Sequence, residues 1–276
     1  MRELTGPREK IWKASQMVPV EASEEANGMY RLLRDISYPK GFVRLLGLTG
    51  RRNYDELTEN LPKLVSRFHD DGVFANWTVV QAATFSENAA AEMEALGGAF
   101  FRSNMIFLHL PEKRERREEI EGIIRSAEQN RLGVLLYVGP AEAPAGGGAV
   151  HVVMEEPEGG WKIGLDLGHS DLALLVAYKL KQNWDCDLVL TAALKEEGLR
   201  KEAQDYLKSV AELARIPNAE CRTAPMEQAG LEGRKPAITV FSMRAGMDLN
   251  GAEAKAKKTG APCLFSLDSG SENAFA

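Results

Sequence analysis

Short apolar segments alternate with amphipathic segments along most of this chain, and this alternation is the feature that most restricts its fold. Residues 42–48 read Phe-Val-Arg-Leu-Leu-Gly-Leu, a nearly continuous apolar run typical of a strand covered on both faces in a parallel sheet. Further strands are predicted at 73–81, 105–110 and 133–138. Strands and helices in this order predict a mainly parallel sheet with helices outside it.

The first helix of this series is predicted from four apolar residues at helical spacing, Leu61, Leu64, Val65 and Phe68. We expect either Asn53 or Asn60 to cap it, with Pro62 in its first turn, because proline is tolerated there.

Two more helices are predicted in the same half, one over 87–96 and one starting at Pro111. The second begins with a dense run of charges at 112–119, followed by isoleucines that fall on one side. We interpret this run as a solvated helix face rather than an interaction patch.

The segment 140–149 interrupts this pattern with Pro-Ala-Glu-Ala-Pro-Ala-Gly-Gly-Gly-Ala, a composition that suits a flexible linker and does not build a core. The alternation then restarts, with strands predicted at 151–154, 187–193, 220–223, 237–243 and 263–267 and helices at 171–184 and 199–214. We therefore expect an α/β protein with two similar subdomains, each a mainly parallel sheet flanked by helices, at 41–139 and 150–276. Residues 1–40 are predicted to be a tether with one helix, and a duplication would explain the repeated rhythm.

Composition excludes several classes of protein. The 34 basic and 40 acidic residues give a net charge of −6 without a clustered basic face, so nucleic-acid binding is not expected. The longest clean apolar run, 172–178, is far shorter than the roughly 20 residues of a membrane-spanning helix. No secretory signal opens the sequence, so we expect a cytoplasmic location. Cys186, Cys221 and Cys263 are far apart and are interpreted as small buried hydrophobes.

Motifs for catalysis or cofactor binding are missing from the sequence. There is no GxxxxGK[ST], GxGxxG or GxSxG, and the glycines at 146–148 are interpreted as spacer. His169, Ser170 and Asp171 are triad residue types, but neighbours in sequence cannot form the triad relay, and Ser170 or Asp171 is expected to cap the helix that follows. His151 and Glu155 lie too far apart on a strand to share a metal. We expect no catalytic residues, no metal and no cofactor.

One loop is a candidate binding site. Ligands of open parallel sheets sit beyond the carboxyl ends of the strands, and the 42–48 strand ends in Thr49, Gly50, Arg51, Arg52 and Asn53. A hydroxyl, a flexible backbone and two guanidinium groups could meet an anion or a nucleotide there. The alternative is a polar loop with two solvated arginines.

Three segments resemble the C-terminal domain of the cation-chloride cotransporter family. Lys40–Gly50 is similar to the family's opening strand, which ends in Leu-Thr-Gly, and 171–190 is similar to its Gly-Leu-Thr-Leu-Leu helix, tryptophan and next strand. The segment 261–267, Ala-Pro-Cys-Leu-Phe-Ser-Leu, resembles its closing strand. The likeness runs in order from Lys40 to the C-terminus. A longer segment, 155–168, replaces the Asp-Asp-Gly-Gly of eukaryotic members, and their long insertions are missing, so the chain resembles a compact prokaryotic version.

This resemblance implies a regulatory and dimerisation domain below a twelve-helix transporter that moves chloride with sodium or potassium. Its partners would be the transmembrane domain of the same polypeptide and a second copy, on the cytoplasmic side of the membrane, and about 12 apolar segments should be encoded upstream. Each half also resembles universal stress proteins, although their Gly-x2-Gly-x9-Gly-Ser/Thr signature is not found. A freestanding nucleotide binder of that type, using Thr49 and Arg51–Asn53, is the alternative.

Overall fold

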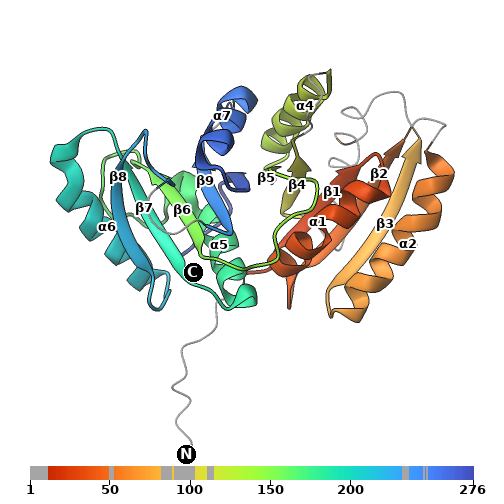
Figure 1. Ribbon diagram of the computed structural model, residues 1–276, viewed down its shortest axis with the longest axis horizontal. Helices are drawn as coiled ribbons and strands as arrows, with labels where there is room; N and C mark the ends of the chain where they lie inside the picture. Colours follow the sequence, from red (N-terminus) through yellow and green to blue (C-terminus); the bar gives the residue numbers. More distant parts are fainter. Residues whose placement is uncertain are drawn as a thin grey trace, which may run out of the picture.

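Figure 1 presents the computed structural model, which describes residues 12–49, 53–81, 89, 103–110, 115–231, 236–244, 246 and 248–276. Within these residues, one ten-stranded sheet runs through the molecule and helices cover both of its faces. No helix in the described part has the length and apolar character needed to cross a membrane.

The first half contributes five strands in the order β3-β2-β1-β4-β5, and every neighbouring pair among them is parallel. Their bounds are β1 (Ser15–Val20), β2 (Phe42–Thr49), β3 (Phe74–Gln81), β4 (Met105–His109) and β5 (Gly133–Val138). The helices described in this half are α1 (Ser23–Ser37), α2 (Tyr54–Asp70) and α4 (Glu115–Gln129). The helix predicted over 87–96 and the start of the helix predicted at Pro111 lie outside the described residues, apart from the buried helical residue Ala89.

The second half repeats this order as β8-β7-β6-β9-β10, again with parallel pairs. Its strands are β6 (Val150–Glu155), β7 (Leu188–Leu194), β8 (Glu220–Pro225), β9 (Ile238–Met243) and β10 (Cys263–Leu267). Its helices are η1 (Gly168–Ser170), α5 (Asp171–Trp184), η2 (Glu197–Leu199), α6 (Arg200–Leu213) and α7 (Leu249–Thr259). The α/β class with two similar, mainly parallel halves is therefore confirmed.

The halves meet where β5 and β10 pair antiparallel, with Leu136 opposite Phe265 at the middle of the register. An approximate two-fold axis passes through this pair, because the strand order reads the same outward from it in both directions. Helices α1, α2, α5 and α6 pack on one face of the sheet, and α4 and α7 pack on the other. Every residue of β2 is buried because both faces of the sheet are covered, and most of its side chains are apolar.

The predicted tether over 1–40 is wrong for most of its length. Ser15–Val20 forms β1, which lies between β2 and β4, and the helix that follows packs in the core. The strand signal was weak because Gln16 is polar and Pro19 lacks an N–H group. Gln16 is nevertheless fully buried, since its amide donates to the Leu33 carbonyl at 2.9 Å and to the Ser37 hydroxyl at 2.7 Å. These two bonds satisfy the Gln16 amide nitrogen, which lowers the cost of burying this polar side chain.

The segment 140–149 is packed rather than loose, which corrects the expectation of a flexible connection. It crosses α1, where the Ala143 N–H donates to the Gly28 carbonyl at 3.0 Å and the Ala143 side chain is buried. A Cβ atom on Gly28 would lie 2.1 Å from the Ala141 carbonyl oxygen, so glycine is required at this crossing. The segment therefore packs on α1 at Ala143, whereas Ala141, Ala145 and Gly147 are exposed.

Two predicted details of the helices are also corrected. Pro62 lies in the interior of α2, because the helix starts at Tyr54. The run of charges is only partly solvated: Arg116 pairs with Glu21 and Glu25, and Arg117 pairs with Glu253 on α7. These ion pairs join α4 to segments that are distant in sequence. The apolar periodicity within one helix cannot predict such contacts.

Candidate functional site

The predicted anion loop is described at its two ends only. Thr49 is the buried last residue of β2, and Asn53 occupies the N-cap position of α2 without a side-chain capping bond. The Asn53 amide instead donates to the Glu21 carbonyl at 3.3 Å. Gly50, Arg51 and Arg52 lie outside the described residues. The structure thus places the end of this loop beside the connection between β1 and α1.

That connection lies at the crossover of the first half, where chain direction along the sheet reverses between β1 and β4. Such crossovers are the usual ligand sites of open α/β sheets. Here the Arg116 guanidinium lies 3.2 Å from Glu21 and 3.1 Å from Glu25. Both of these carboxylates therefore have a basic partner within the chain itself.

The crossover of the second half contains a cavity of about 930 Å³. Met243 and Arg244 at the end of β9 and Leu267 and Asp268 at the end of β10 line it, together with the 157–169 segment, Tyr206 of α6 and Glu128 of α4. We call this space the crossover cavity. No motif in the sequence predicts this cavity, and the unusual length of 155–168 is its one signal there.

Two buried carboxyl groups form one wall of the crossover cavity. Asp268 accepts the N–H groups of Asp171 at 3.0 Å and Leu172 at 2.9 Å, so it caps α5 from the end of β10. Asp171 accepts the N–H groups of Leu167, at 2.7 Å, and Ala274. Ser170 occupies the N-cap position of α5, as expected, but it makes no side-chain capping bond, and Asp268 takes that role.

Burial governs the ionisation of these groups. It raises the pKa of Asp268 to about 8 and that of Asp171 to about 6, with smaller contributions from the Glu272 charge on both. The same effect lowers the pKa of the His169 imidazole. His169, Ser170 and Asp171 do not form a relay, because both Asp171 oxygens accept backbone N–H groups.

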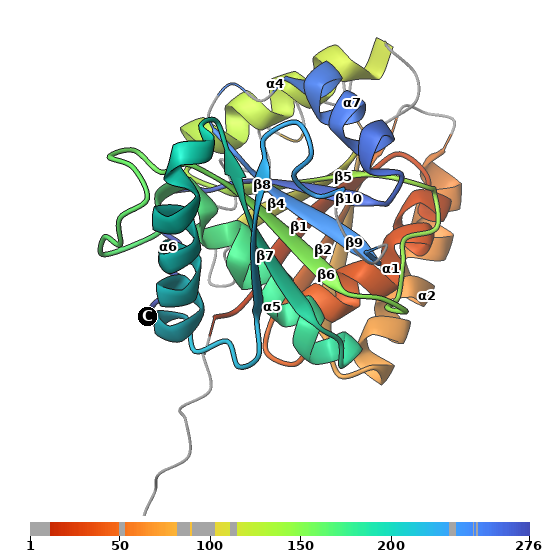
Figure 2. The same cartoon turned by 60° about the vertical axis from the view of Figure 1, so that its left-hand side comes forward.

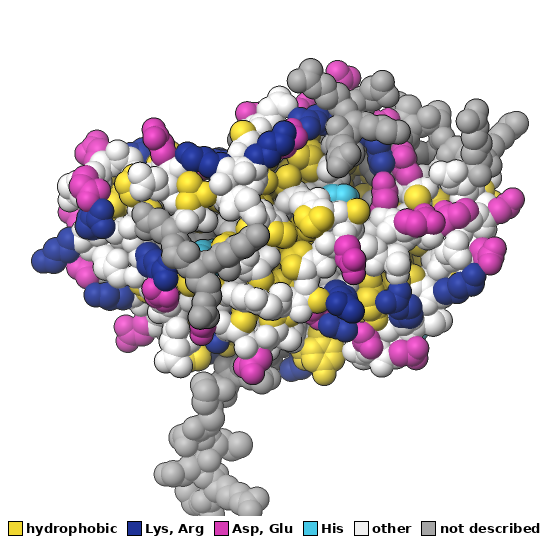
Figure 3. Space-filling model, viewed as in Figure 1, with side chains coloured by type: hydrophobic (Ala, Val, Ile, Leu, Met, Phe, Trp, Pro, Cys, Tyr) yellow, Lys and Arg dark blue, Asp and Glu magenta, His cyan; other side chains and the backbone are white. Residues whose placement is uncertain are grey.

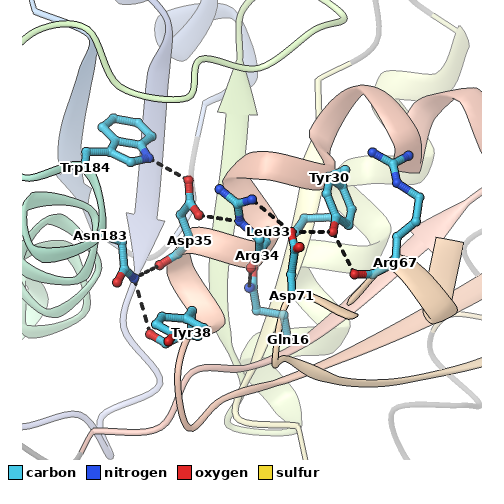
Figure 4. Close-up of polar contacts among 10 residues, drawn as sticks. All are labelled: Gln16, Tyr30, Leu33, Arg34, Asp35, Tyr38, Arg67, Asp71, Asn183 and Trp184. Atoms are coloured by element: carbon cyan, nitrogen blue, oxygen red, sulfur yellow. Dashed lines mark hydrogen bonds and ion pairs between the residues drawn. The ribbon is translucent and has the colours of Figure 1, made fainter. Parts of the chain in front are cut away.

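A second polar cluster joins the two halves on the opposite side from α4 and α7 (Figure 4). The Trp184 indole N–H of α5 donates to the Asp35 carboxylate of α1 at 2.7 Å, and the Asn183 amide donates to the Asp35 and Tyr38 carbonyls. Asp35 is also paired with Arg34 at 2.7 Å. This cluster holds α1 and α5 together across the approximate two-fold axis.

Metal and thiol chemistry find little support in the described part of the chain. No group of three or more His, Cys, Asp or Glu side chains there could hold a metal ion. Cys263 is buried, whereas Cys186 and Cys221 are partly exposed, and burial raises the pKa of all three thiols. On the face seen in Figure 3, basic and acidic side chains are interspersed.

The fold defines the class of protein first. A universal stress protein from Archaeoglobus fulgidus DSM 4304 is similar over 92% of this chain and 96% of its own, with a TM-score of 0.58 at 10% identity. A putative universal stress protein from Pseudomonas aeruginosa UCBPP-PA14 gives a TM-score of 0.54 at 13% identity, covering 92% of each chain. At these identities the likeness concerns the fold alone: two universal-stress-protein-like halves in one chain.

The family follows from stronger matches. Residues 18–144 match the first part, and residues 148–275 the second part, of the C-terminal domain of prokaryotic cation-chloride cotransporters. The crystal structure of the cytoplasmic domain of a prokaryotic cation chloride cotransporter is 40% identical, covers 96% of this chain and 99% of its own, and gives a TM-score of 0.84. This chain belongs to the prokaryotic cation-chloride cotransporter family, as its cytoplasmic C-terminal domain. A search of curated protein sequences found no significant match.

Proposed function

We propose that this domain is a non-catalytic regulatory and dimerisation module of an electroneutral cation-chloride cotransporter, linked to the transmembrane domain of the same polypeptide. The proposal rests on the way in which the two halves are joined. Both family-matched segments build one continuous sheet, and contacts on both of its faces lock the halves. Asp35 with Trp184 does so on one face, and Arg117 with Glu253 on the other. A rigid body of this kind can transmit a force or a binding event to attached membrane helices.

Transport by the full-length protein tests this function. In proteoliposomes, we expect removal of residues 1–276 to change the rate of chloride-dependent rubidium uptake. The set of ions that compete with rubidium and chloride for uptake should stay the same. Light scattering over a concentration series should show that the full-length protein is dimeric and that the isolated domain self-associates. An unchanged uptake rate together with an unchanged dimer would contradict both roles.

The alternative function is nucleotide binding through Thr49 and the Gly50–Asn53 loop. A fold shared with universal stress proteins favours it, whereas the pairing of Arg116 with Glu21 and Glu25 argues against a phosphate site at the first crossover. Calorimetric titration with ATP separates the two. Saturable binding that is lost in an Arg51→Ala, Arg52→Ala variant would favour the alternative or a nucleotide-sensing transporter domain.

A further inference from the structure

The crossover cavity has the place and the size of a small-molecule site. It lies beyond the carboxyl ends of β9 and β10, where open α/β sheets bind their ligands. Its volume of about 930 Å³ falls within the roughly 300–1,000 Å³ of typical ligand pockets. One wall comes from the first half, through Glu128, so the cavity depends on the joined halves.

Charge is strongly unbalanced around this cavity. Among the described residues that line it, Lys162 and Arg244 are basic and six side chains are acidic: Glu128, Glu158, Asp166, Asp171, Asp268 and Glu272. No ion pair found among the described residues includes any of these six carboxyl groups. At the first crossover, by contrast, Arg116 pairs with Glu21 and Glu25.

Buried hydrogen-bonding groups in the wall provide a second, independent observation. Tyr206 is only 4% exposed and lines the cavity, with its ring edge-on to the Trp161 ring. The Nε2 atom of His169, which also lines the cavity, is buried without a hydrogen-bond partner in the described part of the chain. Because unsatisfied buried polar groups are costly, this wall is built to meet a polar ligand. Burial raises the pKa of Tyr206 and lowers that of His169, so both are neutral at pH 7.

We propose that the crossover cavity binds a small organic cation carrying two or more protonated amines, such as a diamine or a triamine. Ammonium groups would pair with Asp166 and Glu158 at the rim, and the Tyr206 hydroxyl and His169 imidazole would accept hydrogen bonds deeper inside. A polyphosphate would instead meet a surplus of negative charge. This site is independent of the regulatory role proposed above.

Proton release is a direct consequence of such binding. Burial raises the pKa of Asp171 to about 6, and the charges of Asp166 and Glu272 add to this rise. Burial likewise raises the pKa of Asp268 to about 8, and there the charges of Glu272 and Asp171 add to it. An ammonium group beside them would lower both pKa values. Amine affinity should therefore increase from pH 6 to pH 8, with a heat of binding that depends on the ionisation enthalpy of the buffer.

Calorimetric titration of the 276-residue chain with spermidine and putrescine tests this site. We expect saturable binding of one spermidine per chain at pH 7.5, with ATP showing none at this cavity. A Glu158→Gln, Asp166→Asn variant should bind spermidine at least tenfold more weakly. The matched control is Glu202→Gln, Asp205→Asn, which removes the same charge from the surface of α6 outside the cavity and should bind as wild type.

Tyr206→Phe keeps the ring and removes only the hydroxyl, and should weaken binding about threefold or more. If that variant does not fold, as judged by circular dichroism, the rim variant alone decides. The proposal is overturned if neither amine binds saturably at low ionic strength. Equal loss of affinity in the rim and control variants would overturn it as well, because attraction would then be a general effect of surface charge.

Discussion

Asp268 caps the N-terminus of α5 by accepting the Asp171 N–H at 3.0 Å, although 97 residues separate the two. The same carboxylate accepts the Leu172 N–H at 2.9 Å. A helix that carries no cap of its own thus takes one from the end of β10, which fixes α5 against the sheet. Because Asp171 in turn binds the N–H groups of Leu167 and Ala274, these two residues tie four segments together.

Loss of this cap should destabilise the domain. Asp268→Ala leaves two helix N–H groups without a partner, and we expect it to lower the free energy of unfolding by about 2 kcal/mol. Urea unfolding measures this change. Asp248→Ala, which removes the exposed cap of α7, serves as the comparison and should cost about 1 kcal/mol or less. An Asp268→Ala effect no larger than that of Asp248→Ala would show that the cap across the sheet is not important.

Stability should also depend on pH through the same carboxyl. The pKa of Asp268 is raised from 3.8 to about 8 in the folded state, so the folded state holds its proton more tightly than the unfolded state. Its stabilising contribution is present below pH 4 and is lost as the pH rises toward 8. Wild type should therefore lose more stability between pH 5 and pH 8 than Asp268→Asn, as measured by urea midpoints. Parallel pH profiles for the two proteins would count against a raised pKa.

Gly28 should resist substitution despite its place in a helix. Alanine normally stabilises a helix relative to glycine by about 1 kcal/mol, but here its Cβ would lie 2.1 Å from the Ala141 carbonyl oxygen. We expect Gly28→Ala to destabilise the domain by about 2 kcal/mol, since backbone must move. Gly198→Ala, where a Cβ meets nothing within 4 Å, is the control and should be nearly neutral. A stabilised Gly28→Ala protein would show that the 140–149 segment does not pack on α1.

The contact between Trp184 and Asp35 should contribute to the coupling of the halves. Trp184→Phe keeps an aromatic ring but removes the donor 2.7 Å from a carboxylate that is 4% exposed. We expect a loss of about 1–3 kcal/mol in thermal or urea unfolding, typical of a hydrogen bond to a charged group. Trp77→Phe on β3, where the tryptophan is 36% exposed, should have a much smaller effect. Equal effects of the two substitutions would exclude a special role for Asp35.

The sequence indicated most strands correctly because their signal is local. Segments such as 133–138 and 263–267 are almost wholly apolar, and the structure has strands with the same bounds. By contrast, β1 was missed because Gln16 and Pro19 break its apolar pattern, and α7 was missed because its 11 residues are rich in alanine and lysine. The Asp171 helix was predicted with its observed bounds, but not the residue that caps it.

By itself, the sequence determined the α/β class, the repeated halves and the resemblance to cation-chloride cotransporters, since burial on both faces of a sheet dictates apolar runs at regular spacing. Only the tertiary structure decided which charges are matched. At the first crossover Arg116 reaches Glu25, 91 residues away, whereas no ion pair among the described residues includes the carboxyl groups that line the cavity at the second. Such ion pairing depends on which chain segments the sheet brings together, and the periodicity of the sequence does not predict it.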